Sequence, residues 1–326
     1  MKKYDPISIE EIKAAQKRIS PDIVRTPLVK LNVDDAPAEI YLKLENLQPI
    51  GSFKIRGTSN AMKIATPEDL KDGVWAISSG NHAQGIAWNA RKLGIKCTLH
   101  VFEWAAQTKI DSLERLGAKV ELIKLKQPID LQEFKDSVDP NSYPDQKGLF
   151  IHAVSNLDVM SGNGTIGLEI IEDLPDVDAV LMPWGGGGLA CGVASAFRAL
   201  RPDVKLYGCE VETATPLAAS FKAGKQVDVD RTPSFVESIG YPFLLPEMWD
   251  LGKQLLDGSL VAGLDDTVSA VRLLAERNKI IAEGASAVSV AAALAGKAGD
   301  GKIVCIVTGG EIDLEELANI FQGKKP

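Results

Sequence analysis

One lysine of this sequence, Lys54, stands in a setting that suits covalent chemistry. The segment PIGSFKIRGTSN (49–60) surrounds it with small and apolar residues. Loss of water around an amine disfavours its charged form, lowers its pKa and makes it a better nucleophile. The alternative is an ordinary solvated lysine. We take Lys54 as the candidate for a covalent bond to a ligand.

A second chemical candidate is the segment SSGNH (78–82), which directly follows the apolar run 74–78. Small residues and an amide stand here where a helix is expected to begin. A helix N-terminus carries unpaired N–H groups and a partial positive charge, so it suits a carboxylate or a phosphate. The alternative is that serine or asparagine side chains of this segment cap the helix.

Four consecutive glycines, Gly185 to Gly188, stand in PWGGGGLACG (183–192) after another apolar run. So many glycines are costly in entropy, and a plain turn needs only one or two. They are expected where several backbone N–H groups must approach a phosphate closely. The segment is not a P-loop, because no Gly-Lys-Ser/Thr follows it.

Two further glycine segments are less specific. VTGGE (307–311) would end a strand at Thr308 with the hydroxyl facing the same cleft, although the glycines could form a plain turn. GNGTIG (162–167) formally matches Gly-x-Gly-x-x-Gly. It begins eight residues after the preceding predicted strand, and no acidic residue follows at the distance that a dinucleotide site requires. A dehydrogenase is therefore disfavoured.

The elements that must position these loops alternate along the chain. Strands are expected at 40–46, 74–78, 96–102, 119–125, 149–154, 179–184, 205–211 and 302–308. Helices are expected at 7–19, 82–94, 109–117, 189–200, 265–279 and 286–296. The polar segment 126–147, which contains prolines, is expected to cover or link the elements on either side of it. Alternation of this kind predicts parallel α/β sheets, in which ligands bind beyond the carboxyl ends of the strands.

Composition narrows the possible partners and the compartment. The formal net charge is −8 and no Lys/Arg tract is present, so we expect no nucleic-acid partner. No run of eighteen apolar residues occurs, so we expect no membrane span. The cysteines stand far apart, which predicts buried reduced thiols and a cytoplasmic protein; they are Cys97, Cys191, Cys209 and Cys305.

The segments SFKIRG, SSGNH and GGGGL, in this order, resemble those of the fold type II pyridoxal-phosphate enzymes. The chain is most similar to their threonine/serine dehydratase and serine racemase family, from about residue 20 to 320. The resemblance implies a tryptophan synthase beta-like fold, with two parallel-sheet α/β domains and pyridoxal 5′-phosphate in the cleft between them. The expected large cofactor-binding domain covers 1–66 and 147–326, and the small domain covers 67–146. A homodimer is also implied.

The resemblance assigns a role to each candidate residue. Lys54 would condense with the cofactor's aldehyde and later take a proton from the substrate, Phe53 would pack at the cofactor ring, and Thr308 would face the pyridine nitrogen. Asn81 would donate a hydrogen bond to the ring's 3-oxygen. The N–H groups for the phosphate would come from Gly185, Gly186, Gly187, Gly188 and Leu189. The substrate carboxylate would be held by Ser78, Ser79, Asn81 and His82.

The implied reaction is the dehydration of a β-hydroxy amino acid to a 2-oxoacid and ammonia. A hydroxyl at Thr308 does not favour a protonated pyridine nitrogen as an aspartate would, and this suits prompt loss of a β-leaving group. The substrate would be L-threonine, L-serine or a bulkier compound such as a β-aryl serine. One alternative is a serine racemase with Ser79 as the second acid/base. The others are a β-replacement enzyme of the cysteine/threonine synthase type and a non-catalytic cofactor-binding protein.

The sequence departs from the family pattern near the substrate's expected side chain. HAVSN (152–156) replaces a His-Pro-aromatic stretch, Glu237-Ser238 replaces Asp-Gly, and Glu311 replaces a frequent asparagine. These changes leave open, beside serine and threonine, a bulkier substrate such as a β-aryl serine.

The racemases' divalent-ion site is incomplete in this chain. Glu210 matches its first carboxylate, but Pro216 stands where the second is expected, so only a weak candidate site remains even if Glu212 substitutes. His100 and His152 lack ligand spacing and are interpreted as packed strand histidines.

Overall fold

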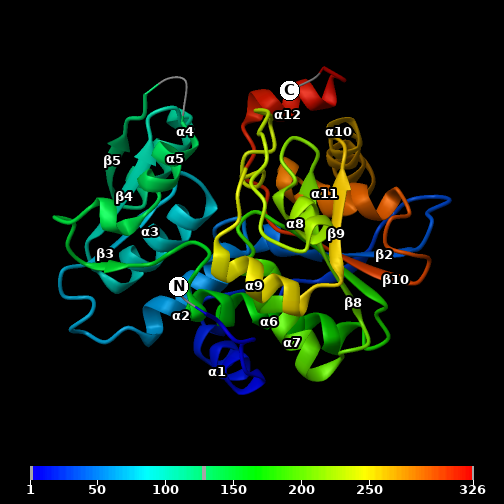
Figure 1. Cartoon of the computed structure of the whole chain (residues 1–326), viewed down its shortest axis with the longest axis horizontal. Coiled ribbons are helices and arrows are strands. Elements are labelled where there is room, and N and C mark those ends of the chain that lie inside the picture. Colours follow the sequence, from blue (N-terminus) through cyan, green and yellow to red (C-terminus); the bar gives the residue numbers. More distant parts are fainter. Residues whose placement is uncertain (1–2, 127–129, 325–326) are drawn as a thin grey trace.

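A six-stranded sheet forms the larger part of the molecule in the computed structural model, which describes residues 3–126 and 130–324 (Figure 1). All of its neighbouring strands pair in parallel except β1 and β2, which are antiparallel. This short edge hairpin was not expected from the sequence. In spatial order the strands are β1 (Leu28–Lys30), β2 (Glu39–Leu44), β10 (Lys302–Val307), β7 (Ala179–Pro183), β8 (Lys205–Val211) and β9 (Gly258–Ala262).

A separate four-stranded sheet lies beside it and is parallel throughout. Its order is β5 (Lys119–Ile123), β4 (Cys97–Phe102), β3 (Val74–Ile77) and β6 (Leu149–Phe150). The sequence pattern placed 149–154 in the second series of strands, and this was wrong: β6 pairs with β3 over Leu149 and Phe150. The division of the chain into domains at residues 66 and 146 stays a prediction.

Helices pack on both sheets close to the expected positions. Ser8 caps α1 as predicted, because its side chain accepts from the backbone N–H of Glu11. The expected helix 265–279 divides into α10 and a π-helical turn, Leu274–Asn278. The helices are α1 (Ile9–Ile19), α2 (Lys54–Ile64), α3 (Asn81–Leu93), α4 (Gln107–Arg115), α5 (Leu131–Ser137), α6 (Leu157–Asp173), α7 (Gly188–Leu200), α8 (Pro216–Ala223), α9 (Pro246–Leu255), α10 (Leu264–Leu273), α11 (Gly284–Leu294) and α12 (Leu314–Phe321).

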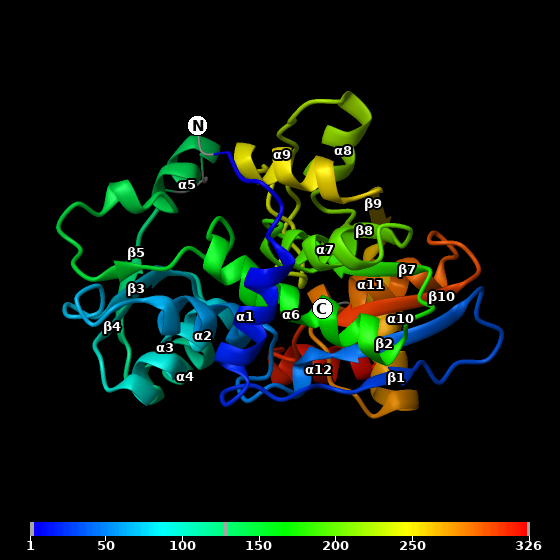
Figure 2. The ribbon, with the colours of Figure 1, turned by 90° about the horizontal axis from the view of Figure 1, so that it is seen from below.

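The GNGTIG segment lies inside α6, so it is not a strand-to-helix loop, and the argument against a dinucleotide site is confirmed. Its glycines allow close helix packing against α2 and α7 (Figure 2). A Cβ at Gly164 would lie 2.9 Å from the carbonyl oxygen of Gly192 in α7. A Cβ at Gly57 of α2 would lie 2.7 Å from the carbonyl oxygen of Val159 in α6. Helix α6 thereby fixes the start of α2, where Lys54 stands.

A buried ionic network ties the same elements together. Arg56 donates to Glu45 and Glu169 through Nε and Nη1 at 2.7 Å each. Lys43 Nζ lies 2.6 Å from the second oxygen of Glu169. All four side chains are buried, and their charges balance. The network joins α2 to α6 and to strand β2, and it accounts for the arginine of SFKIRG, for which the sequence suggested no role.

The segment 126–147 covers the four-stranded sheet as expected, although residues 127–129 lie outside the described residues. Phe134 of α5 stacks on Phe102 of β4 and on Tyr241, with ring centroids 5.5 and 6.5 Å apart. Lys135 Nζ lies 2.7 Å from Asp228 Oδ2. Helix α5 therefore links the four-stranded sheet to the segment between α8 and α9.

The cysteines and the helices of the described residues bear on two further expectations, reduced buried thiols and the lack of a membrane span. All four cysteines are free and buried. Burial raises the pKa of Cys97 to about 12, so this thiol stays protonated. None of the helices described has the length and apolar character needed to cross a membrane.

Candidate active site

The lysine segment and the VTGGE segment are held against each other at the carboxyl end of β10. The backbone N–H of Phe53 donates to the carbonyl of Thr308 at 2.9 Å, and Gly310 donates to Gly51 at 3.0 Å. Ser52 and Gly309 form an isolated antiparallel bridge. The sequence placed Lys54 and Thr308 in one cleft, and these bonds bring their segments together.

Lys54 is the first residue of α2, and its side chain is half-buried at the site. Nζ donates to the carbonyl of Ala153 at 3.2 Å and lies 5.2 Å from the centroid of the Phe53 ring. Burial lowers the pKa of Lys54 to about 8, although the negative charge of Glu283 acts in the opposite direction. A substantial fraction of this amine is therefore neutral, and nucleophilic, slightly above neutral pH.

The glycine segment lies next to the same stretch of chain. A Cβ at Gly186 would lie 2.5 Å from Val154, and a Cβ at Gly188 would lie 3.0 Å from the Val154 carbonyl oxygen. Val154 adjoins Ala153, the partner of Lys54, so the glycine segment and the lysine meet here. Helix α7 begins at Gly188, and no side chain caps it. The first N–H groups of α7 are thus left for an anion.

Helix α3 presents a second uncapped N-terminus. Its N-cap is Gly80, and no side chain makes a capping hydrogen bond. The capping interpretation of SSGNH is therefore wrong. Ser78 Oγ accepts from the N–H of Gly80 at 3.4 Å, and the Ser79 side chain is half-buried. The N–H groups of this first turn suit the carboxylate that the resemblance places here.

Asn81 and His82 stand at this N-terminus and are buried. Asn81 Nδ2 donates to Glu283 Oε1 at 3.0 Å, while its Oδ1 has no partner within the described residues. His82 Nε2 lies 2.9 Å from the Ile151 carbonyl and must donate to it. Burial lowers the pKa of His82 to about 3, and the nearby charge of Lys54 acts in the same direction. The ring is neutral and has no further N–H, so only the backbone of His82 can donate to a carboxylate.

Glu283 and Ser286 are site residues that the sequence analysis missed. The carboxylate of Glu283 accepts from Asn81 on one oxygen and from Ser238 Oγ on the other, both at 3.0 Å. Ser286 Oγ lies 2.8 Å from Thr308 Oγ1. Both residues stand at the start of α11, in AEGAS (282–286), where no glycine-rich loop follows a predicted strand. No local pattern marked them, because the contacts that matter come from distant segments.

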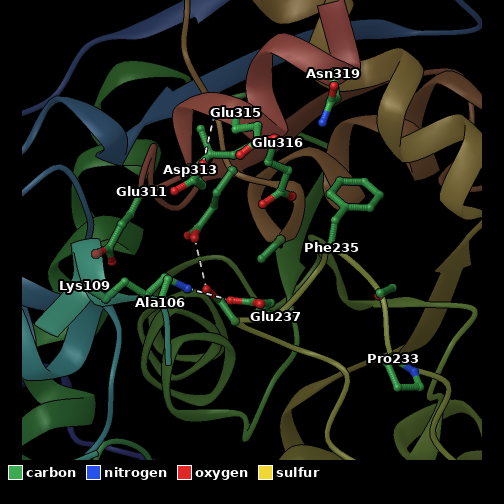
Figure 3. A pocket seen from close by; sticks show the side chains of 15 residues that line it. Ala106, Lys109, Pro233, Phe235, Glu237, Glu311, Asp313, Glu315, Glu316 and Asn319 are labelled. Atoms are coloured by element: carbon green, nitrogen blue, oxygen red, sulfur yellow. Dashed lines mark hydrogen bonds and ion pairs between the residues drawn. The ribbon is translucent and has the colours of Figure 1, made fainter. Parts of the chain in front are cut away.

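A cavity of about 580 Å³ adjoins the site, and three of the residues that depart from the family pattern line it, although the segment 152–156 does not (Figure 3). These residues are Glu237, Ser238 and Glu311. Lys109 of α4 points toward Glu237, with Nζ 2.5 Å from Oε2. Burial raises the pKa of Glu311 above its ordinary value, and this glutamate also accepts from Gln84. The departures therefore cluster where a substrate side chain could extend.

The proposed ion ligand Glu210 is occupied by protein donors. It accepts from the backbone N–H groups of Leu217 and Ala218 at 2.8 Å and from Ser259 Oγ at 2.7 Å, so it caps α8. Glu212 accepts from Leu264 N at 2.7 Å. Across residues 3–126 and 130–324, no group of three or more His, Cys, Asp or Glu side chains is arranged to hold a metal ion.

His100 is a packed strand histidine of β4, as expected, but the same interpretation of His152 was wrong, because this residue is half-buried in the loop after β6. His100 lies 3.1 Å from Gln146 Oε1 and packs edge-on against Trp75. His152 Nδ1 accepts from the N–H groups of Val154 and Ser155 at 3.0 and 2.9 Å. This second histidine shapes the loop that carries Ala153 and Val154.

The residues present fit pyridoxal phosphate. A glycine cradle without room for side chains adjoins an uncapped helix N-terminus, which suits a phosphate. A half-buried lysine amine with a lowered pKa lies beside it and suits an aldehyde. Buried polar atoms without partners in the described part of the chain, Asn81 Oδ1 and Ser52 Oγ, remain for a bound molecule.

We expect Gly187→Ala to weaken cofactor binding about tenfold or more. Gly187 has φ +96°, and an added Cβ would lie 2.5 Å from the buried ring of Trp184. Relief of this clash must move the backbone N–H groups of the cradle, and a charged hydrogen bond is worth about 1.5–3 kcal/mol. Cofactor titration followed by absorbance measures the loss.

Gly117→Ala is the matched control for this substitution. Gly117 has φ +90°, and nothing lies within 4 Å of its added Cβ. The control imposes similar backbone strain far from the cradle, so it should lower stability and leave cofactor affinity unchanged. Equal affinities for the two variants would contradict the assignment of the glycine cradle.

Comparison with known proteins agrees with this geometry. The profile of a family described as "Pyridoxal-phosphate dependent enzyme" matches residues 19–309. The L-threonine ammonia-lyase of Thermotoga maritima is 37% identical over 320 residues, which cover 97% of this chain and 78% of the relative. The catabolic L-threonine dehydratase of Staphylococcus aureus is 34% identical over 327 residues, which cover 97% of this chain and 92% of the relative.

Solved structures place the fold in the same group. Maize serine racemase superposes with a TM-score of 0.88 at 29% identity and covers 98% of each chain. Threonine deaminase isoform 2 from Solanum lycopersicum superposes with a TM-score of 0.84 at 26% identity, covering 99% of this chain and 93% of the other. The expected fold type II architecture is confirmed. The chain belongs to the family of pyridoxal-phosphate dependent enzymes, in its threonine/serine dehydratase and serine racemase branch.

Proposed function

We propose that this enzyme is a dehydratase that converts a β-hydroxy amino acid to a 2-oxoacid and ammonia. The observation that carries the proposal is the position of Lys54. Its amine is bonded to Ala153, next to the residue that contacts the glycine cradle, and its backbone segment is bonded to that of Thr308. The L-threonine dehydratases among the relatives support the reaction class.

The cofactor, when bound, supplies an aldehyde that condenses with amines and a ring that withdraws electrons from the carbon bearing the amine. The chain's own residues do the rest. Lys54 Nζ takes the proton from that carbon, and the pKa of about 8 suits a base near neutral pH. The β-hydroxyl then leaves and takes up this proton, so that it departs as water and Lys54 is returned to its free amine. Hydrolysis returns a water and yields the 2-oxoacid and ammonia, so atoms balance.

Thr308 determines how strongly the cofactor ring withdraws electrons in this proposal. Its hydroxyl lies 2.8 Å from Ser286 Oγ, and both side chains are buried. A pair of hydroxyls would stabilise a protonated pyridine nitrogen less than a carboxylate would. A negative charge on the reacting carbon is then less stabilised, which favours prompt loss of the β-hydroxyl over transfer of the amine.

The uncapped N-terminus of α3 orients the substrate in this proposal. Its N–H groups, with the hydroxyls of Ser78 and Ser79, would hold the substrate carboxylate. The side chain then extends toward the cavity lined by Glu237, Ser238 and Glu311. We propose that a side chain larger than that of serine is accepted there.

The test is the release of 2-oxoacid from a panel of L- and D-β-hydroxy amino acids, which includes serine, threonine and β-aryl serines. We expect release from at least one L-amino acid, with a larger side chain favoured over serine. Absence of 2-oxoacid from the whole panel, with cofactor bound, would overturn the proposal.

A serine racemase is the second candidate, and Ser79 favours it. Helix α3 is capped by no side chain, so the Ser79 hydroxyl is not used for capping and could serve as a second acid/base. Maize serine racemase shares the fold closely. D-serine formed from L-serine without 2-oxoacid would favour this candidate. Products of β-replacement would instead favour an enzyme of the cysteine/threonine synthase type. No turnover of any amino acid would favour a non-catalytic cofactor-binding protein.

We further propose that the protein acts as a homodimer, as its resemblance to the family implies, and in the cytoplasm, as its scattered cysteines predict. A divalent cation is not part of the proposal, because Glu210 is occupied by three protein donors. Sedimentation of the purified protein at several concentrations tests the oligomeric state.

A further inference from the structure

Ser155 is a buried serine in the loop that joins β6 to α6, and the proposed reaction assigns it no role. It belongs to HAVSN (152–156), one of the segments that depart from the family pattern. The residue is only 5% exposed. Its hydroxyl donates to Glu247 Oε1 of α9 at 2.6 Å. A carboxylate oxygen is an acceptor, so the single proton of the Ser155 hydroxyl is used in this bond.

The N-terminal segment of the chain reaches the same hydroxyl. Tyr4 Oη lies 3.1 Å from Ser155 Oγ and 3.3 Å from the Ser155 carbonyl oxygen. Because the proton of Ser155 goes to Glu247, the Tyr4 hydroxyl must be the donor here. The segment is itself held in place, since the N–H of Ile7 donates to Ser195 Oγ of α7 at 3.0 Å. Ser155 therefore connects its loop to α9 and to the start of the chain.

Hydrogen bonds within the loop couple Ser155 to its neighbours. The N–H groups of Val154 and Ser155 donate to the same atom, His152 Nδ1, at 3.0 and 2.9 Å. At the end of the loop, the side chain of Asn156 accepts from the N–H of Val159 at 3.0 Å and caps α6. Because two successive residues share one acceptor, a displacement of Ser155 also moves Val154.

Two parts of the cofactor site rest against this loop. The carbonyl of Ala153 accepts from Lys54 Nζ at 3.2 Å. Val154 packs on the glycine cradle, since a Cβ added at Gly186 would lie 2.5 Å from Val154 Cγ2. A Cβ added at Gly188 would lie 3.0 Å from the Val154 carbonyl oxygen. The lysine and the cradle are thus placed relative to each other by one short loop.

We infer that Ser155 is a positioning residue, which holds the loop where the Lys54 amine and the glycine cradle can engage one cofactor molecule. It acts through its bonds to Glu247 and Tyr4, which come from elements outside the cradle. The inference deepens the proposed function and rests on it for its catalytic meaning. It also gives a role to the serine of HAVSN.

The test is the circular dichroism of the visible cofactor band in the full-length protein saturated with pyridoxal 5′-phosphate. A flat ring gives a strong signal only where the protein holds it in one asymmetric setting. In Ser155→Ala we expect the signal per bound cofactor to fall. The dissociation constant of the cofactor, measured by absorbance titration, should rise about tenfold, the lower end of what a hydrogen bond to a charged group contributes.

Glu247→Ala tests whether the effect is transmitted from outside the site. This variant removes the acceptor on α9 and leaves every atom of the loop in place. We expect the same kind of loss as in Ser155→Ala, and the double variant should lose no more than Ser155→Ala alone. Tyr4→Phe should lose less, because the bond to the carboxylate remains. Tyr4 and Glu247 are only half-buried, so these variants keep the test decisive if Ser155→Ala does not fold.

Ser161→Ala is the matched control. Ser161 is 1% exposed, and its hydroxyl donates to the Leu157 carbonyl within α6 at 2.8 Å. This variant should leave the dichroism and the cofactor affinity unchanged. Unaltered dichroism and affinity in Ser155→Ala and Glu247→Ala, or equal losses in Ser161→Ala, would overturn the inference. The measurements need no substrate, so a failure to release 2-oxoacid refutes the proposed function alone.

Discussion

Lys54→Ala is expected to abolish turnover and the visible absorbance that the bound cofactor owes to its bond with the lysine. Positioned acid–base groups contribute about 10²–10⁴ in rate, and loss of the covalent bond adds to this. Turnover should therefore fall at least that far. The half-buried amine donates to the Ala153 carbonyl and lies over the Phe53 ring, and no ion pair holds it among the described residues, so its removal should disturb the fold little. Absorbance spectra and the release of 2-oxoacid measure the two losses.

Two controls separate chemistry from packing in this experiment. Lys54→Arg keeps a positive charge but has no amine to condense, so it should be as inactive as the alanine variant. Addition of a small primary amine to Lys54→Ala should restore part of the proton transfer. Full activity in either variant without added amine would refute the role of Lys54.

The loops of the site could be predicted because their chemistry is local. SSGNH, the glycine run and VTGGE each follow an apolar run that predicts a strand. The glycine run and VTGGE follow strands of the six-stranded sheet, whose parallel strands present their carboxyl ends at one edge, whereas SSGNH follows a strand of the four-stranded sheet. The strands β3, β7 and β10 lie where these runs were expected. The shared edge brings the segments of Lys54 and Thr308 together, as the bond from Phe53 N–H to the Thr308 carbonyl shows. The glycine run meets the same site through its contacts with Val154.

The parts that the sequence could not predict depend on contacts between distant segments. Glu283 meets Asn81 across 202 positions of the chain and Ser238 across 45, and its own neighbours carry no signal. Strand β6 has only two residues, so periodicity could not tell which sheet would accept it. The alternative of a capped α3 failed for a related reason, because Asn81 turns its amide to Glu283 rather than to its own helix.

Arg56 shows how such distant contacts support the site. Among the substitutions proposed here, its replacement should lower the free energy of unfolding the most. Arg56→Met removes one positive charge from a network in which Glu45 is fully buried and Glu169 is nearly so. Lys43 alone cannot balance two carboxylates, and an uncompensated buried charge costs about 3–5 kcal/mol. We expect urea unfolding to report a loss of this size. Cofactor binding should weaken as well, because Arg56 stands on α2 two residues after Lys54.

A second substitution tests whether charge balance, rather than packing, is the cause. Arg56→Met combined with Glu45→Gln leaves Glu169 paired with Lys43 at 2.6 Å and restores neutrality. Each single substitution should destabilise the protein, but the double variant should lose much less than their sum, and it should be more stable than Arg56→Met alone. Additive losses would mean that Arg56 acts by filling space. In that case the arginine of SFKIRG would support the position of Lys54 through packing and not through its charge.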